Sequence, residues 1–517
     1  MTTEAARAGR VNEHSPRLGP GSPPTRPPTC RHTIRRVDMG DSSLWRNIMV
    51  NVDSYKNAHY GMYPDGTEYV SSYIESRGGR FPATLFVGLQ AFLREYLTRQ
   101  ITLDDIHEAE AVHRPMGIPF NRQNWIDLLN DHDGYLPIEI EAVPEGTVVP
   151  TGNVLVQLVN TDPRYPWITG FVETALLRAV WYPTTVGTLS WTAKQLMKGF
   201  LERTSDHPEA IRMYLHDYGN RGVSSLESAG LGGMAHLVNF DQTDTVPAYV
   251  AARQWYNAAA PNGSAVFQEH STVAAAGRDA EADTFRSLLK FPGVVVAGLL
   301  VDTFDHGRAV NEILGKEMHD EISQFQGLVA VRCDSGDPIK VPVDTVESLM
   351  DSFGHETNGK GFKVLPQNIR VIQGDGLILD TYTAIYTELE ARGLAADNVL
   401  CGMGGGLLQQ VNRDTLNFGF KASAMRINGE WRETVKAPTG SAMKRSKGGR
   451  LALRYTDGTY STVPRDSIPA EENQLVPVFR DGKMLRQWDF TELIERSERP
   501  TPESYYSGVV QGVAGVH

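Results

Sequence analysis

Four short apolar runs, each followed at once by polar or glycine residues, mark the middle of this 517-residue chain. They occupy residues 294–301, 328–331, 369–372 and 399–400, and the stretches between them include apolar residues at helical spacing. The clearest helix is predicted around Tyr382, Ile385, Tyr386 and Leu389, with Gly393 as its stop. Strands that alternate with helices predict an α/β fold built on a parallel sheet or barrel.

The residues that end these four strands predict a ligand site. The first run is followed by Asp302, the second by Arg332 and Asp334, the third by residues 374–376 and the fourth by residues 402–406. In parallel α/β architectures, ligands bind at the carboxyl ends of the strands. Glycine and aspartate are also ordinary turn residues, but four such endings in succession indicate one polar rim.

The glycines of residues 402–408 predict a phosphate cradle, because glycine lets the backbone approach an anion closely. The run is neither GxGxxG nor a Walker A loop, and a glycine-rich turn without a ligand is the alternative. Asp334 and Asp375 are candidates for binding sugar hydroxyls or Mg²⁺. Three arginines are candidates for phosphate binding or stacking: Arg221, Arg332 and Arg413.

His270 and the basic segment at residues 444–450 have simpler explanations as well as functional ones. The segment holds four cations in seven positions, a pattern typical of a solvated loop. A lone histidine is usually structural, although Asp302 could orient the His270 ring and raise its basicity.

The regions on either side of the alternating segment have another pattern. Helices are predicted over residues 85–97 and 124–129, and antiparallel strands over residues 138–142 and 154–159. Short strands and turns return after residue 415. We therefore expect four parts: a disordered extension (1–43), a mixed α+β domain (44–165 and 415–495), a catalytic α/β domain (166–414) and a loose C-terminal tail (496–517).

Composition excludes several classes of protein. A net charge of −12 disfavours general nucleic-acid binding, which needs a basic face. No apolar run approaches the roughly 20 residues that span a bilayer, and the start lacks the apolar core of a secretory signal. Three widely spaced cysteines, Cys30, Cys333 and Cys401, suggest neither a disulfide framework nor a zinc site. A cytoplasmic enzyme is expected.

Taken together, the motifs resemble those of the nicotinamide phosphoribosyltransferase family. The resemblance runs from about residue 51 to residue 492, in the family's order. Its blocks lie at residues 51–56, 59–60, 63–64, 215–225, 236–240, 243–245, 269–272, 332–336, 371–376, 404–409 and 444–447.

The resemblance implies an irregular, TIM-like α/β barrel with a second, mostly β domain, working as a homodimer with active sites at the interface. The reaction would join nicotinamide to phosphoribosyl pyrophosphate, giving nicotinamide mononucleotide and pyrophosphate. Tyr218 and Arg332 would sandwich the nicotinamide ring, and Asp244 would accept a hydrogen bond from the carboxamide. Three residues would reach in from the other subunit: Asp53, Tyr55 and Arg77.

The same resemblance assigns the remaining site residues. Asp334 would bind the ribose hydroxyls with Asp375 nearby, and His270 would be phosphorylated by ATP while paired with Asp302. Mg²⁺ would assist the leaving pyrophosphate. Groups that would hold the product phosphate are Arg221, Gly374, Gly404 and Gly405, and those that would approach the ATP or pyrophosphate phosphates are Lys436 and Lys444.

Two departures from the vertebrate form of the family concern the base pocket. Tyr218 stands where phenylalanine is usual, and Gly298 stands where serine is common. Asp244 should repel the carboxylate of nicotinic acid, which favours the amide as substrate. The alternatives are a nicotinate phosphoribosyltransferase, a non-catalytic signalling or binding protein, and an unrelated barrel hydrolase with two carboxylates.

Overall fold

A computed structural model describes residues 46–259, 265–437 and 446–509. Its centre is a seven-stranded sheet in which every neighbouring pair of strands is parallel. The strands in chain order are β6 (Leu215–Asp217), β7 (Gln242–Thr243), β8 (Val266–Phe267), β9 (Val296–Leu300), β10 (Leu328–Cys333), β13 (Ile369–Gln373) and β14 (Val399–Met403). The four predicted apolar strands are β9, β10, β13 and β14, so these predictions are confirmed.

The order of the strands shows that this sheet is an incomplete barrel. Across the sheet the order is β7-β6-β14-β13-β10-β9-β8. Read as a ring, this is the order of the strands along the chain, with β14 pairing back to β6. In the described part of the chain the ring lacks only a pairing between β7 and β8. The predicted α/β barrel is confirmed, and it is open between these two strands.

Contacts between side chains show how strongly the sheet curls. In a flat sheet, β6 and β8 would lie five strand spacings apart, or about 24 Å. The ring centroids of His216 on β6 and Phe267 on β8 are 5.7 Å apart. The sheet therefore bends until side chains from its two ends meet inside the barrel.

Amphipathic helices connect the strands of the barrel. On α12 (Lys340–Phe353) the buried residues include Val343, Val346, Leu349 and Met350, at helical spacing. The predicted helix near residue 385 is α13 (Leu379–Ala391), which buries the predicted side chains and is followed by Gly393 at φ 71°. The other longer helices of the barrel are α6 (Leu226–Leu237), α7 (Val246–Tyr256) and α9 (Glu281–Leu289).

A second seven-stranded sheet takes its strands from both ends of the described chain. Its order is β16-β15-β1-β5-β3-β19-β20, and its paired strands are antiparallel. The predicted pair at residues 138–142 and 154–159 is β3 (Ile138–Ala142) beside β5 (Val154–Asn160). The other strands are β1 (Thr67–Ser76), β15 (Phe418–Ile427), β16 (Glu430–Glu433), β19 (Val476–Arg480) and β20 (Lys483–Met484). The exact domain boundaries stay a prediction.

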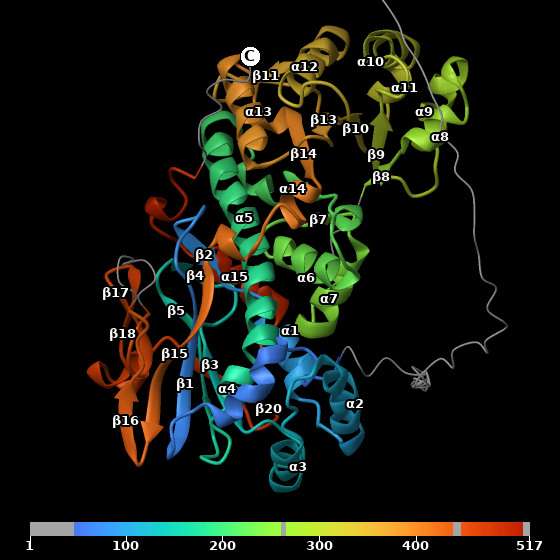
Figure 1. Cartoon of the computed structure of the whole chain (residues 1–517). Coiled ribbons are helices and arrows are strands. Elements are labelled where there is room, and N and C mark those ends of the chain that lie inside the picture. The colour runs from blue at the N-terminus through green and yellow to red at the C-terminus, as the bar shows by residue number, and fades with distance from the viewer. Residues whose placement is uncertain (1–45, 260–264, 438–445, 510–517) are drawn as a thin grey trace, which may run out of the picture. The chain divides into compact units, whose positions relative to one another are not determined.

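One long helix connects the two sheets. Helix α5 (Glu173–Thr204) has 32 residues and contacts both β15 of the antiparallel sheet and α6 and α13 of the barrel (Figure 1). Pro183 lies within it, and 20 of its residues are buried. A helix buried along most of its length forms core for both sheets rather than a solvent-facing cover.

The predicted helix over residues 85–97 is partly wrong. Leu85 belongs to strand β2 (Ala83–Leu85), and the helix begins at α1 (Leu89–Phe92), continuing as a π-helical turn over Leu93–Leu97. Gly88 at φ 107° separates the two elements. The helix predicted at residues 124–129 is α3 (Arg122–Asp131). Within the described ranges, none of the helices combines the length and apolar character needed to cross a bilayer.

Candidate active site

A cavity with a volume of about 790 Å³ lies where the strands of the barrel end. Its lining comes from the segments that follow β6, β7, β10, β13 and β14. The lining residues are Tyr218, Asn220, Arg221, Gly222, Asp244, Arg332, Asp334, Gly374, Asp375, Gly376, Leu377, Ile378, Gly404, Gly405, Gly406 and Gln410. The sequence predicted nine of them as site residues, and the fold brings those nine to one rim.

Tyr218 and Arg332 lie face to face in this cavity. The guanidinium carbon of Arg332 is 5.5 Å from the centre of the Tyr218 ring. The ring rests on Gly402, where an added Cβ would lie within 2.8 Å of three ring carbons. The Tyr218 hydroxyl is buried without a hydrogen-bond partner among the described residues. Burial, with a smaller effect of Asp244, raises the pKa of Tyr218 well above its usual value.

Asp244 follows β7 and is held by a histidine that the sequence analysis did not select. His216 Nε2 lies 3.0 Å from Asp244 Oδ1, and the His216 ring centroid lies 4.8 Å from that of Tyr218. His216 is buried, whereas 43% of the Asp244 side chain is exposed. The pair places an oriented carboxylate beside the aromatic ring. Its only sequence signal is the strand alternation that puts residues 216 and 218 on one face.

Arg332 and Asp334 form the next part of the rim. Arg332 Nη2 donates to Asp334 Oδ1 at 2.9 Å. An added Cβ at Gly374 would lie 2.6 Å from that carboxylate oxygen and 3.1 Å from Arg332 Nε. The glycine therefore leaves room for the ion pair, in which Arg332 contacts Asp334 while its guanidinium faces Tyr218.

His270 lies between two carboxylates at the edge of this cluster. His270 Nε2 is 3.4 Å from Asp302 Oδ1, and Nδ1 is 4.0 Å from Asp334 Oδ2. Asp302 also accepts hydrogen bonds from the Asp334 backbone amide at 3.2 Å and from the Ser335 hydroxyl. The His270 side chain is 48% exposed and that of Asp302 is 5% exposed. A buried carboxylate thus orients a histidine that solutes can reach.

Glycines make the two facing loops of the cavity possible. An added Cβ at Gly406 would overlap the carbonyl oxygen of Leu377, and one at Gly222 would lie 3.4 Å from the Cα of Gly405. The glycine run leads from β14 into the short helix α14 (Gly405–Leu408), as predicted. The turn Asn220–Gly222, which carries Arg221, approaches it from the other side. Close backbone with a nearby arginine suits an anion such as phosphate.

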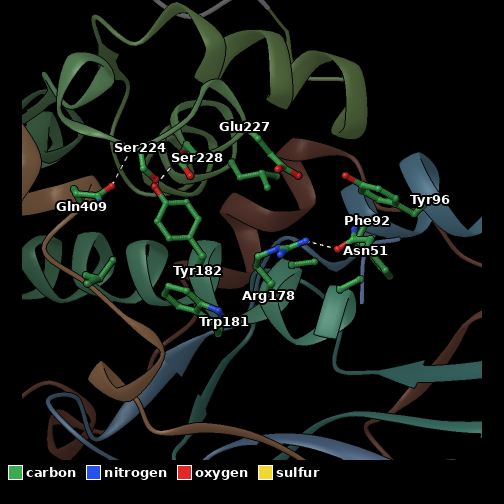
Figure 2. A pocket seen from close by; sticks show the side chains of 14 residues that line it. Asn51, Phe92, Tyr96, Arg178, Trp181, Tyr182, Ser224, Glu227, Ser228 and Gln409 are labelled. Carbon is green, nitrogen blue, oxygen red and sulfur yellow. Dashed lines mark hydrogen bonds between the residues drawn. The ribbon is translucent and has the colours of Figure 1, made fainter. Parts of the chain in front are cut away.

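A smaller cavity of about 220 Å³ adjoins the same loops (Figure 2). Gln409 Oε1 accepts a hydrogen bond from the Ser224 backbone amide at 3.2 Å, tying the loop that carries Arg221 to the end of α14. The Tyr182 hydroxyl, which Figure 2 shows beside Ser224 and Ser228, lies within hydrogen-bond distance of the backbone carbonyls of Ser228 and Leu408, at 3.0 and 2.9 Å. Helix α5 therefore supports both loops of the candidate phosphate cradle.

Other predicted site residues lie outside the larger cavity of the single chain. Arg77 Nε donates a hydrogen bond to the Asn417 carbonyl oxygen at 3.1 Å. Arg413 Nη2 lies 3.6 Å from Asp414 Oδ1, and the Lys436 side chain is exposed. Asp53 and Tyr55 lie in the N-terminal segment. Lys444 falls outside the described residues. The roles assigned to these side chains stay predictions.

Seven lining residues were given no individual role in the sequence analysis. Gly376 and Gly406 fall within the predicted strand endings at residues 374–376 and 402–406, and the other five lie within three positions of a predicted site residue: Asn220, Gly222, Leu377, Ile378 and Gln410.

Comparison with known sequences identifies the family. The profile of the nicotinate phosphoribosyltransferase (NAPRTase) family matches residues 213–483, more than half of the chain. That of the nicotinamide phosphoribosyltransferase N-terminal domain matches residues 47–140. A nicotinamide phosphoribosyltransferase from Xanthomonas campestris is 45% identical over 458 residues, covering 86% of this chain and 97% of the relative. Another, from Acinetobacter baylyi, is 30% identical over 490 residues, covering 87% and 97%.

Comparison with solved structures supports the fold. A nicotinate-nucleotide pyrophosphorylase from Pyrococcus furiosus superimposes with a TM-score of 0.57 at 14% identity, covering 91% of this chain and 97% of that one. Human nicotinic acid phosphoribosyltransferase gives a TM-score of 0.53 at 18% identity, covering 88% and 95%. At such low sequence identity, these structures support the fold and say nothing about the activity. The sequence matches and the fold agree: this chain belongs to the nicotinate phosphoribosyltransferase family and, within it, to the nicotinamide phosphoribosyltransferases.

Proposed function

We propose that this protein is an enzyme that condenses nicotinamide with phosphoribosyl pyrophosphate, forming nicotinamide mononucleotide and pyrophosphate for NAD salvage. One observation carries the proposal: a carboxylate, Asp244, is oriented by His216 beside the facing pair of Tyr218 and Arg332. A flat ring with an amide substituent fits this arrangement, because the ring can stack between Tyr218 and Arg332 while the amide donates a hydrogen bond to Asp244. The curated relatives that bear the name of this activity add to the argument.

Stacking between Tyr218 and Arg332 would position the base. Two van der Waals contacts of 3.5–4.0 Å need roughly 7–8 Å between the flanking groups, whereas Arg332 now lies 5.5 Å from the ring centre. The guanidinium must therefore move outward by about 2 Å when a base enters. A base fixed in this way presents its ring nitrogen to C1 of the sugar, which is catalysis by proximity.

Asp244 would select the amide over the acid. Its carboxylate accepts a hydrogen bond from a carboxamide NH₂ but repels the carboxylate of nicotinic acid. The same negative charge favours the product, because the pyridine ring becomes cationic once it is joined to the sugar. The proposal therefore places nicotinate phosphoribosyltransferase activity second.

Asp334 and Asp375 fit a Mg²⁺ ion that arrives with the substrate's pyrophosphate. Mg²⁺ usually takes one or two protein carboxylates together with phosphate oxygens and water. Both carboxylates line the cavity, and the described residues hold no cluster of three or more such ligands. When bound, the ion would neutralise charge on the leaving pyrophosphate. Asp334, fixed by Arg332, would also accept hydrogen bonds from the ribose hydroxyls.

We further propose that ATP phosphorylates His270. Asp302 Oδ1 lies 3.4 Å from Nε2 of the ring, which leaves Nδ1 as the nitrogen to be phosphorylated. That nitrogen would take the γ-phosphoryl group of ATP with release of ADP. Its position near Asp334 puts the phosphohistidine at the same rim as the pyrophosphate, and Lys436 and Lys444 would approach these phosphates.

We also propose a homodimer with shared active sites, located in the cytoplasm. Tyr55 is 57% exposed, and three other exposed apolar side chains are Met62 (69%), Leu226 (76%) and Val246 (69%). Asp53, Tyr55 and Arg77 would complete the partner's base pocket. The thiols of Cys333 and Cys401 are free and buried, in keeping with a reducing compartment.

Product formation tests the proposal. The full chain is incubated with phosphoribosyl pyrophosphate, Mg²⁺ and either nicotinamide or nicotinic acid, and the mononucleotide is quantified by chromatography. We expect nicotinamide mononucleotide as the main product; absence of this product, with and without ATP, refutes the proposed function.

A second assay tests the role of His270. The ratio of rates with and without ATP is measured for wild type, His270→Ala and the control His207→Ala, whose side chain is 72% exposed and paired with Glu209. ATP stimulation should be lost in His270→Ala alone. Stimulation that persists there contradicts the phosphohistidine.

A further inference from the structure

Phe267 occupies a position inside the barrel that only glycine at residue 298 makes possible. The two residues are register partners on β8 and β9. An added Cβ at Gly298 would lie within 2.7 Å of three ring carbons of Phe267. The ring therefore lies directly on the backbone of β9, and any larger residue at 298 would displace it.

The other neighbours of the Phe267 ring belong to the candidate base site. Its centroid lies 5.7 Å from that of His216 and 6.0 Å from that of Tyr218, with interplanar angles of 82° and 81°. Edge-to-face contacts of this kind fix the relative positions of aromatic rings. Phe267 thus stands against the histidine that holds Asp244 and against the ring expected to stack on the base.

Phe267 is not explained by core packing. It is half-buried and is not among the buried side chains that form the hydrophobic core. Its neighbour Val266 is 39% exposed, and β8 has only two residues at the open edge of the barrel. The described contacts of this large apolar side chain are therefore with His216, Tyr218 and Gly298 rather than with the hydrophobic core.

We propose that Phe267, seated on Gly298, closes the interior side of the base pocket and restricts the substrate to pyridines with a small carboxamide. The inference rests on the proposed function. Because His216 contacts both Asp244 and Phe267, Phe267 lies on the side toward which the carboxamide points. A bulky group on the amide nitrogen would meet the Phe267 ring.

Substrates of increasing size test whether Phe267 closes this side of the base pocket. Nicotinamide and its N-methyl, N-propyl and N-benzyl amides are compared with wild type, Phe267→Ala and the milder Phe267→Leu, in kcat/KM. We expect wild type to discriminate strongly against the N-benzyl amide. Phe267→Ala should improve the ratio of N-benzyl amide to nicotinamide by about tenfold or more, with Phe267→Leu between. An unchanged ratio in both variants overturns the proposal.

Gly298, on which the Phe267 ring is seated, gives an independent test. Gly298→Ala should push the ring toward His216 and Tyr218 and raise the KM for nicotinamide by about tenfold, with a smaller effect on kcat. Adding Phe267→Ala to Gly298→Ala should restore the KM, because it removes the ring that the added methyl group displaces. If Gly298→Ala is neutral, or the double variant is worse than either single one, the seating of Phe267 on Gly298 does not shape the pocket.

Failure of the proposed function stays distinguishable from failure of this inference. Wild type that makes no mononucleotide from nicotinamide refutes the function. The dissociation constants of the same four amides for the full-length variants, measured by calorimetry, still show how large an amide the pocket accepts, because this measurement needs no turnover. If the affinity of each larger amide relative to nicotinamide is the same in wild type and Phe267→Ala, Phe267 does not limit the size of the substrate.

Discussion

The chemistry of single residues at this site depends on which polar groups have partners. Asp244 is oriented by His216, and Asp334 is held by Arg332. The Asp244 carboxylate is therefore oriented before a substrate binds, which lowers the ordering cost of binding, whereas the partner of Asp334 must shift to admit the base. The Tyr218 hydroxyl differs, because it is buried without a partner among the described residues.

Removing that hydroxyl should stabilise the protein. Tyr218→Phe keeps the ring on Gly402 and eliminates an unsatisfied polar group, so the free energy of unfolding should rise by about 1 kcal/mol. Tyr218→Leu, which also removes the aromatic ring, should lower it. Urea denaturation of the two variants beside wild type checks this, and a loss of stability in Tyr218→Phe would show that the hydroxyl has a partner.

Among the structural elements, the loops after β10 and β13 depend on each other. Gly374→Ala places a methyl group 2.6 Å from Asp334 Oδ1, so the Arg332–Asp334 pair must separate. The fold should survive, but kcat/KM should fall by about tenfold or more, since a charged hydrogen bond contributes roughly 1.5–3 kcal/mol. Gly199→Ala on α5, where the added methyl meets only the flexible end of Arg203 at 3.3 Å, is the control. Equal activity of the two variants would show that the pair is dispensable.

The contact of α6 with α5 and β7 predicts a pH dependence of stability. His236 on α6 lies 2.9 Å from Ser190 Oγ and 3.3 Å from the Gln242 carbonyl oxygen. Burial lowers the pKa of His236 to about 3, below its usual 6.5 in the unfolded chain, so the unfolded state binds this proton first as the pH falls. Stability is therefore lost below pH 6.5, and between there and pH 5 the loss is about 2 kcal/mol.

Denaturation at pH 7 and pH 5 measures this effect. His236→Gln, which cannot titrate, should lose about 2 kcal/mol less than wild type between the two pH values. Equal losses would assign the acid sensitivity to other groups.

Sequence alone predicted the elements better than the contacts between them. Asp302, Arg332 and residues 374–376 could be placed at one rim because parallel strands end at a common edge. The pairing of His216 with Asp244 and the seating of Phe267 on Gly298 could not, since both depend on strand order and register across the barrel. Leu85 was misplaced because a three-residue strand before a helix leaves too few residues to separate the two periods.

At the scale of the whole molecule, the proposed dimer makes each site from two chains. Tyr55→Ala and Arg332→Ala should each be nearly inactive alone. Mixed in equal amounts and allowed to exchange subunits, they should recover about a quarter of wild-type activity, because half the dimers are mixed and each of these holds one intact site. No recovery in mixtures shown to contain mixed dimers would place Tyr55 outside its partner's site.

Selection of nicotinamide by Asp244 is the central claim, and the ratio of kcat/KM for nicotinamide to that for nicotinic acid tests it most directly. We predict that wild type strongly prefers nicotinamide. In Asp244→Ser, the ratio should fall roughly tenfold to a hundredfold, because nicotinamide loses one charged hydrogen bond and nicotinic acid is no longer repelled. The same ratio in wild type and Asp244→Ser would contradict the account.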